Sequence, residues 1–449
     1  MQCRRFTALV LPAVLLAGCL SLCSAQEPAP FAYMQLGAVP RRYSLIDQGR
    51  KPAVRSQGEL GTCWAISACS AIESDLLPQK KQIFSPDHMS LRNGYETTQE
   101  DGGDYTMIMS YLAGWKGPVE EAEDPYGDGV SPEGLRAQVH VQEMQLLRGM
   151  SRQQIKKMIL LYGAAQSSLC MDRSRTDLDA YGYYAKETAA YYDPFTEELN
   201  HDILVLGWDD TYPRENFRIR PARDGAWICQ NTWGEDFGDD GIFYVSYEDK
   251  NLFRKGGIVY SGIEEASDTQ RVCQQDSLGW LGRQGYERET CYFAGVFQAG
   301  RQESIRGIGF YTTGPGTACR IFLIPEYTSP EDLESVAPAQ SEEIPAEKAR
   351  LLAAGQIANA GFHTVRIPSE VNLRKGQTYA VAVEINTPGE GKPVAVEKAK
   401  DQFTQSVTTQ GHQTYLSKDG SRWENTQEAY ETNVCMKVYT DKQQFPWSE

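Results

Sequence analysis

The stretch around Cys63 constrains the fold of this chain more than any other short segment. Gly61 breaks the backbone just before the cysteine, and the largely apolar run 64–72 that follows predicts a buried helix ending before Pro78. Cys63 therefore lies at a helix N-terminus, where aligned peptide dipoles and unpaired N–H groups stabilise a thiolate. Because the thiolate is the nucleophilic form, an attacking cysteine would be placed here. The alternative is a buried structural cysteine, the commoner fate of an isolated one.

Three polar residues elsewhere complete a candidate catalytic set. His201 begins an apolar strand-like run 138 residues after Cys63, and Asn231 ends a second apolar run 30 residues further on. Gln57 precedes the cysteine by six residues. Taken singly, each has an ordinary alternative: a buried core histidine, a turn asparagine before Gly234 and a surface glutamine. Their order and spacing together favour catalysis.

These motifs resemble those of the papain-like cysteine peptidases over roughly residues 42–262. The shared features are Gln57, the Cys63-Trp64 pair, His201 followed by an apolar strand and Gly207-Trp208-Asp209, and Asn231-Thr232-Trp233-Gly234. The resemblance implies that Cys63 attacks a peptide carbonyl, and that His201 takes the thiol proton and later protonates the leaving amine. It further implies that Asn231 orients the imidazole, that Trp233 shields that contact, and that Gln57 and the Cys63 N–H donate to the oxyanion.

Other positions near this set either fit the family or depart from it. Gly102 and Gly103 fit as a place where a substrate backbone approaches closely, with an ordinary polar turn as the alternative. Asp202 follows His201 where a small apolar residue is usual, and its charge would favour the imidazolium if the two side chains approach. Strand alternation sends neighbours to opposite faces, which leaves that contact open. The remaining departures, none of which removes a catalytic atom, are Leu60, Ile66 and Thr232.

The composition limits the class of partner. The chain has 449 residues, enough for two or three domains, and a net charge of −16 that argues against binding nucleic acid. No CxxC pair or His/Cys cluster suggests a metal, so we expect neither metal nor cofactor.

The N-terminus predicts an exported protein. Residues 1–25 read as a secretory signal, with an apolar core too short to span a bilayer comfortably. Two cleavage sites compete. A lipoprotein-type site would leave Cys19 lipidated and the protein anchored to a membrane, whereas an ordinary site would leave Gln26 as the first residue. Residues 26–41 would form a tether.

The rest of the first domain reads as helices followed by strands, which predicts an α+β fold. In that fold the peptidase (42–262) has two lobes, with Cys63 and His201 on opposite walls of a cleft. A capping-box pattern at Ser151 and Gln154 marks the start of one helix. The predicted helices are 105–115 and 155–162, and the predicted strands are 203–207, 226–230 and 242–247.

Beyond a polar linker at 263–275 the pattern changes to short alternating runs between turns. This predicts an all-β antiparallel sandwich over 276–441, with an exposed insertion at 328–353 and a tail at 442–449. The region resembles the lectin-like domain that follows the peptidase in some exported bacterial papain relatives, which implies a glycan as an open alternative partner. Three aromatic residues could stack on sugars or lie in the core, the core being favoured: Trp280, Tyr415 and Trp423.

The chain has 11 cysteines, three of them in the leader region. Cys229 and Cys435 lie in apolar runs and are expected to behave as small core residues. Two bridges fit the order of the remaining cysteines, Cys273 with Cys291 and Cys319 with Cys435, but sequence does not fix the pairing.

These observations favour an exported cysteine endopeptidase acting on proteins or peptides at the cell envelope or outside the cell. Two alternatives come from other classes: a surface carbohydrate-binding adhesion protein with a vestigial peptidase, and a Cys-dependent cell-wall amidase. The intact set of Gln57, Cys63, His201 and Asn231 argues against the first. The Gln57 and Asn231-Thr232-Trp233-Gly234 motifs argue against the second.

Overall fold

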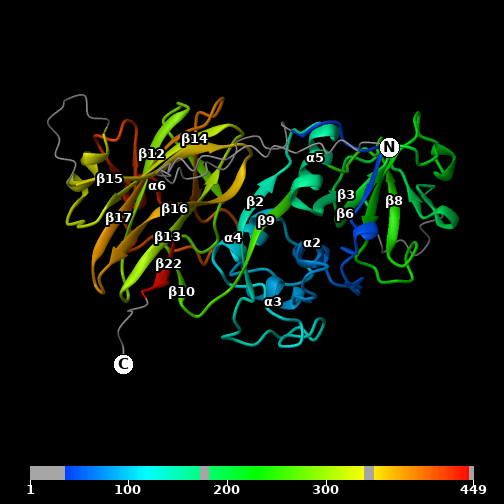
Figure 1. The fold of residues 1–449 in the computed structure, drawn as a ribbon, viewed down its shortest axis with the longest axis horizontal. Helices are drawn as coiled ribbons and strands as arrows, with labels where there is room; N and C mark the ends of the chain where they lie inside the picture. The colour runs from blue at the N-terminus through cyan, green and yellow to red at the C-terminus, as the bar shows by residue number, and fades with distance from the viewer. Residues whose placement is uncertain (1–35, 172–181, 338–347, 444–449) are drawn as a thin grey trace, which may run out of the picture.

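The computed structural model describes residues 36–171, 182–337 and 348–443 as two bodies lying side by side (Figure 1). The N-terminal body carries the longer helices and a twisted sheet, and the C-terminal body is almost entirely strand, with one short helix. The predicted leader, Cys19 and most of the predicted tether lie outside the described residues. No helix of the described part is long and apolar enough to cross a membrane.

The helices that the sequence predicts after Cys63, at 105–115 and at 155–162 are all confirmed. The central helix α2 (Cys63–Leu76) is buried along most of its length, from Trp64 to Ser74. At the start of α4, the Asp104 carboxylate accepts hydrogen bonds from the first-turn amides, and at the start of α5 Ser151 and Gln154 form the predicted capping box. The bounds of the other helices are α3 (Pro86–Leu91), α4 (Tyr105–Ala113), α5 (Arg152–Tyr162) and α6 (Thr426–Tyr430).

A mainly antiparallel sheet forms the second lobe of the N-terminal body, and all three predicted strands are confirmed within it. Its strands run in the order β2-β9-β3-β6-β7-β8-β5-β4, and β1 pairs with β6. Gly207 allows β1 to approach, because a Cβ there would lie 2.1 Å from the Tyr43 carbonyl oxygen. The bounds are β1 (Arg42–Ser44), β2 (Val139–Leu146), β3 (Ala165–Leu169), β4 (Tyr184–Ala185), β5 (Ala190–Tyr191), β6 (His201–Asp209), β7 (Ala226–Gln230), β8 (Ile242–Ser246) and β9 (Gly257–Glu265).

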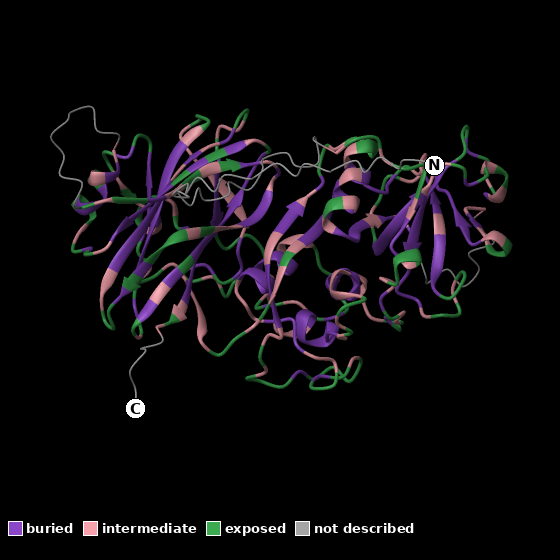
Figure 2. Ribbon diagram, viewed as in Figure 1, coloured by how far each residue is buried: buried purple, intermediate pink, exposed green. Residues whose placement is uncertain are grey.

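The C-terminal body is the predicted antiparallel sandwich. One sheet has the order β15-β14-β17-β12-β19-β20, and the other contains β10-β22-β13-β16. The inward-facing side chains of the two sheets form a separate apolar core, visible as buried stretches in Figure 2. The bounds are β10 (Gln270–Gln274), β11 (Gly282–Gln284), β12 (Thr290–Gln298), β13 (Glu303–Thr312), β14 (Thr317–Ile324), β15 (Arg350–Ile357), β16 (Gly361–Leu373), β17 (Thr378–Asn386), β18 (Val394–Glu397), β19 (Thr414–Ser417), β20 (Glu424–Asn425), β21 (Asn433–Val434) and β22 (Met436–Lys442).

One sheet continues from the first body into the second, which the sequence did not predict. Strand β16 pairs with β2, placing Phe362 opposite Met144 and His363 opposite Glu143. The His363 imidazole also contacts the Glu143 carboxylate. In place of a free linker, residues 263–275 hold the end of β9, a turn and β10. The two bodies are therefore joined by backbone hydrogen bonds as well as by side-chain packing.

Aromatic stacking reinforces the junction. Trp115, just after α4, lies between the rings of His140 and Tyr439, with centroids 3.7 Å and 4.4 Å away. The Tyr439 hydroxyl donates to the Ala113 carbonyl oxygen at 2.7 Å. Burial lowers the pKa of His140 to about 4, so this imidazole is neutral at neutral pH.

The two expected disulfide bridges are absent among the described residues. Cys273, Cys291, Cys319 and Cys435 are all free and buried, so both pairings are wrong. Strand order explains this in part, because Cys291 lies on β12 and Cys273 on β10, in opposite sheets of the sandwich. Cys229 and Cys435 are core residues, as expected, with exposures of 0% and 2%.

Candidate active site

The thiol of Cys63 lies against the beginning of β6. Cys63 is the first residue of α2, and the Asp202 backbone N–H donates to its Sγ at 3.4 Å. Because Asp202 directly follows His201, this contact brings the candidate nucleophile and the candidate base into the same place. Residues that are far apart in the sequence thus meet where the central helix packs on the sheet.

The candidate base is held by the candidate asparagine. His201 Nε2 lies 2.7 Å from Asn231 Oδ1, and both residues are buried. Their strands explain the contact, since β6 and β7 pair with Leu204 opposite Gln230. The Trp233 ring lies 4.9 Å from the imidazole, tilted by 38°, and is itself buried. The structure therefore brings together three residues that sequence order alone had grouped.

Gln57 is fixed to the same segment. Its backbone N–H donates to the Thr232 carbonyl oxygen at 2.7 Å, and its side-chain Oε1 accepts from the Thr232 hydroxyl at 2.6 Å. Its Nε2 donates to the Leu60 carbonyl oxygen at 2.7 Å, which uses one of the two amide protons. Thr232 and Leu60, two of the departures from the family pattern, are therefore the partners that orient this amide.

The glycine loop lies next to the nucleophile. Gly61 N–H donates to the Gln99 carbonyl oxygen at 2.8 Å, which holds this loop against the start of α2. A Cβ on Gly103 would lie 2.3 Å from the Trp64 ring, so any other residue would displace the indole. Gly102 has a φ of 79°, in the left-handed region. Gly103 is thus required by packing and Gly102 is favoured by its backbone conformation, and Gly103 is exposed beside the first turn of α2.

The electrostatics of the thiol differ from the expectation for a helix N-terminus. Burial and the Asp202 charge raise the pKa of Cys63 to about 12, and they outweigh the amide hydrogen bonds that lower it. These amides belong to Asp202, Trp64 and Cys63 itself. The amides at the helix start do favour the thiolate, but burial and the Asp202 charge favour the neutral thiol more strongly.

A buried polar network behind Cys63 was missed by the sequence reasoning. Gln166 Nε2 donates to the Asp202 carboxylate at 2.6 Å, and its Oε1 accepts from the Tyr260 hydroxyl at 2.7 Å. The Tyr105 hydroxyl lies 3.2 Å from Ser168 Oγ. Burial raises the pKa of the Asp202 carboxyl. The only signal in the sequence was the run of polar residues inside the buried strand β3.

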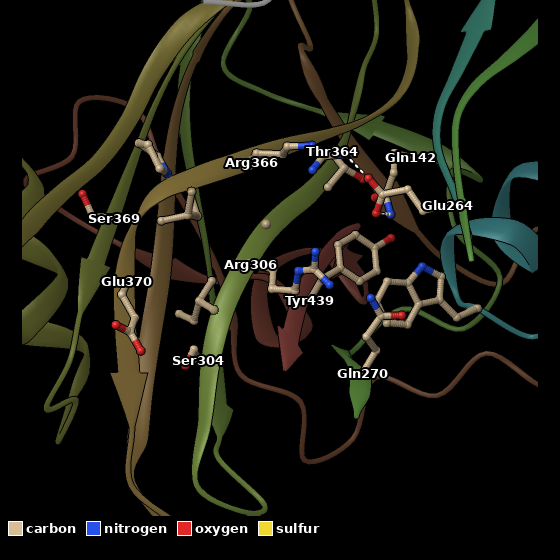
Figure 3. A pocket seen from close by; sticks show the side chains of 15 residues that line it. Gln142, Glu264, Gln270, Ser304, Arg306, Thr364, Arg366, Ser369, Glu370 and Tyr439 are labelled. Carbon is tan, nitrogen blue, oxygen red and sulfur yellow. Dashed lines mark hydrogen bonds and ion pairs between the residues drawn. The ribbon is translucent and has the colours of Figure 1, made fainter. Parts of the chain in front are cut away.

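The described residues hold no apparent metal site. No group of three or more His, Cys, Asp or Glu side chains there is arranged to hold a metal ion. Cavities occur at the junction of the two bodies. One of about 250 Å³ beside Tyr439 is shown in Figure 3, with Thr364, Arg366 and Glu264 on one side and Ser369 and Glu370 on the other.

Both halves of the chain match models of known protein families. Residues 39–263 match the papain family cysteine protease model, and residues 272–440 match the lectin like domain model. Procathepsin L of Rattus norvegicus is 23% identical over 221 residues, covering 47% of this chain and 62% of that protein. Cathepsin S of Bos taurus is 27% identical over 214 residues, covering 46% and 59%. The chain thus spans about 60% of the length of these curated relatives.

Solved structures match nearly the whole chain. The clostridial cysteine protease Cwp84 after propeptide cleavage superposes with a TM-score of 0.76 at 23% identity, covering 90% of this chain and 99% of that one. The cysteine protease and lectin-like domains of Cwp84, a surface layer associated protein of Clostridium difficile, give 0.75 at 22% identity, covering 91% and 90%. At this identity the match establishes the fold. With the family model covering half of its length, the chain belongs to the papain family of cysteine proteases, here followed by a lectin-like domain.

Proposed function

We propose that the protein is an exported cysteine endopeptidase that hydrolyses peptide bonds with Cys63 as nucleophile and His201 as base. One observation carries the proposal. The imidazole is held by Asn231 at 2.7 Å, while the next residue along β6 donates its N–H to Cys63 Sγ. A nucleophile beside a base that is itself oriented by a third group is the general arrangement of covalent hydrolases.

The hydrogen bonds of Asn231 support a specific tautomer of His201. Asn231 Oδ1 also accepts from the Thr232 backbone N–H at 2.8 Å, which identifies that atom as the oxygen. An amide oxygen can only accept, so His201 Nε2 must carry a proton. Nδ1 is then the basic nitrogen that takes the proton of the Cys63 thiol and later delivers it to the leaving amine.

The rise in the Cys63 pKa bears on when this transfer occurs. A buried thiolate is costly by itself, so we propose that ionisation takes place as a pair with the His201 imidazolium once substrate displaces water. The thiolate then attacks the peptide carbonyl, the amine leaves with the proton from His201, and water hydrolyses the thioester. Trp233 shields the His201–Asn231 bond from water during both steps.

Two donors would stabilise the oxyanion. The Cys63 N–H lies at the start of α2, and the second proton of the Gln57 amide is not used by its bond to Leu60. In other enzymes one such donor contributes roughly 3–4 kcal/mol to the transition state. Gly102 and Gly103 would lie along the substrate backbone, since they border the Cys63-Trp64 turn.

The cellular location is part of the proposal. Cwp84 is described as surface layer associated, which is consistent with a cell-envelope or exported location here. The apolar leader supports export, and lipidation of Cys19 remains a prediction that mass spectrometry of the mature N-terminus would test.

A glycan ligand for the lectin-like domain also remains a prediction. Of the three aromatic candidates for sugar stacking, Tyr415 is a core residue with 5% exposure, whereas Trp280 and Trp423 are partly exposed. In the cavity of Figure 3, Arg366 pairs with Glu264, and Arg306 pairs with Asp441 at 3.0 Å. We therefore assign no sugar to that cavity, and a glycan array with the full chain would test the prediction.

The proposed function is tested by labelling and turnover together. An epoxysuccinyl inhibitor should form an adduct at Cys63, located by peptide mass spectrometry, and should abolish cleavage of a peptide library. Cys63→Ala should remove both the adduct and the cleavage without unfolding the protein. Cys170→Ser is the matched control, because Cys170 is another partly exposed thiol and its loss should change neither. Near-normal turnover in Cys63→Ala would contradict the mechanism.

A further inference from the structure

A second cavity, of about 290 Å³, lies between the two bodies close to the candidate active site. The peptidase contributes Tyr105 from the start of α4, Leu146 from the end of β2, Arg148 from just after it, and Lys255 from just before β9. The lectin-like domain closes it with Trp280 and Arg283. Because β2 pairs with β16, the two bodies belong to one sheet and this cavity is a fixed feature of the molecule.

The cavity has an apolar wall and a cationic rim. Arg148 and Lys255 are exposed, and neither has an ion-pair partner among the described residues. Arg283 lies over the Trp280 ring, 5.1 Å from its centroid, and pairs with Glu390 at 2.7 Å. The chain has a net charge of −16, so a cavity bordered by three cationic side chains is unusual on its surface.

One acidic residue lines the cavity, and its carboxylate is already engaged. Asp104 Oδ1 accepts from the Thr106 and Met107 amides at 2.8 Å and 3.3 Å, as the N-cap of α4. Asp104 keeps its negative charge and weakens the field of Arg148 and Lys255, but it forms no ion pair with either among the described residues. An anionic group entering it would meet Arg148 and Lys255 first.

The cavity is connected to the candidate active site through Tyr105. The Tyr105 hydroxyl contacts Ser168, which pairs across β3 and β6 with Asp202, the residue after His201. Tyr105 also lies only two residues after Gly103 in the chain. Gly257, which lines the cavity, pairs with Ser167 on β3, so the strand that borders the cavity, β9, lies two strands from β6, or roughly 10 Å. An extended peptide covers that distance in about three residues.

We propose that this cavity is a substrate subsite, built by both domains, that selects peptides with an acidic side chain two to four residues from the scissile bond. The inference rests on the proposed peptidase function and adds the substrate class to it. The carboxylate meets Arg148 and Lys255, while the neighbouring part of the peptide packs on Leu146 and Trp280. The lectin-like domain thereby acts in peptide recognition, because Trp280 and Arg283 complete the wall.

The test compares pools of random, internally quenched decapeptides in which Glu or its uncharged isostere Gln is fixed at one position at a time. Wild type should cleave the Glu pools about three- to tenfold faster at positions two to four residues from the bond, the range expected for two partly exposed ion pairs. The preference should fall as salt is added, because screening weakens exposed pairs. Arg148→Gln/Lys255→Gln should bring the ratio close to one, and Lys255→Glu should lower it further.

Arg254→Gln is the matched control, because Arg254 is the neighbour of Lys255 but pairs with Glu197 at 2.9 Å and does not line the cavity. It should keep the wild-type ratio. A wild-type ratio near one, or a ratio that survives in the double variant, would overturn the inference while leaving the peptidase function in place.

Binding of the same pools to immobilised Cys63→Ser protein, read by mass spectrometry, separates the two hypotheses. Retention of the Glu pools without turnover by wild type would support the subsite and reject the peptidase. Equal retention of both pools would overturn the subsite even if no pool were cleaved.

Discussion

The Asp202 carboxylate accepts a hydrogen bond of 2.6 Å from Nε2 of Gln166. The same Nε2 also donates to the Trp64 carbonyl oxygen at 3.1 Å, in the first turn of α2. Gln166 therefore links the helix that carries Cys63 to the strand that carries His201. A buried amide that bonds to both lobes fixes their relative position, and a negative charge placed there acts on the thiol at the same time.

This relationship predicts the effect of Asp202→Asn on the thiol. The Asp202 charge raises the pKa of Cys63, so removing the charge should lower that pKa and make the thiol reactive at lower pH. The asparagine oxygen can still accept from Gln166, which limits structural damage. The measurement is the rate of alkylation of Cys63 by iodoacetamide across a pH series. The exposed carboxyl Asp236 gives the control, and Asp236→Asn should leave the profile in place. An unshifted profile in Asp202→Asn would show that its charge does not reach the thiol.

The contact between His201 and Asn231 predicts how the losses of activity combine when catalytic residues are substituted singly and together. His201→Ala should lower kcat by about 10³-fold or more, since general-base catalysis and nucleophile activation are lost together. The double variant Cys63→Ala/His201→Ala should be little worse than Cys63→Ala, because the two residues act as one unit. Asn231→Ala should cost less than either, since it orients the imidazole without reacting. The single-turnover rates of all four variants should be measured. If the rate losses of Cys63→Ala and His201→Ala multiplied in the double variant, the shared role of the two residues would be contradicted.

Much of the fold and of the candidate site could be predicted because each part leaves a local signal. Local patterns predict the element in which they lie. The apolar run after Cys63 and the capping residue Ser151 each indicate a helix, and the apolar runs beside His201 and Asn231 each indicate a strand. The pairing of β2 with β16 could not be predicted, since alternation marks Phe362 as a strand residue but does not name its partner. The same holds for the free Cys273 and Cys291, whose separation depends on which sheet each strand joins.

Residues that act through a buried network were also beyond sequence reasoning. Gln166 looks like an ordinary polar residue until the fold places it between Trp64, Asp202 and Tyr260. Asp202 departs from the family pattern, but its effect on the site depends on the direction in which its side chain points. Strand alternation does not decide whether the Asp202 side chain contacts His201. Only the pairing of β3 with β6 shows that its partner is Gln166.

A buried carboxylate in α2 predicts how stability depends on pH. Burial raises the pKa of Glu73 to about 7, although Arg55 pairs with it and the Phe84 N–H donates to it at 2.8 Å. Because the folded state holds this proton more tightly than the unfolded state, stability should fall as pH rises from about 4.5 to 7. Ionisation of Glu73 should lower the free energy of unfolding by on the order of 1–3 kcal/mol over this pH range. Urea titrations at pH 5 and 7 test it, and Glu73→Gln should flatten the slope even if it lowers stability overall. An equally steep slope in Glu73→Gln would assign the effect to other groups.

The stacking of Trp115 between His140 and Tyr439 predicts that the two domains unfold as one unit. They share a sheet through β2 and β16, and the indole fills the junction beside it, so calorimetry of the wild type should give a single transition. Trp115→Ala removes both stacks and should cost about 3 kcal/mol, lowering Tm by several degrees. With the side-chain contacts gone, the transition should broaden or split into two. Trp423→Ala is the matched control, because Trp423, just before β20, packs only against the core of the lectin-like domain. Two transitions already present in the wild type would show that the shared sheet does not couple the domains.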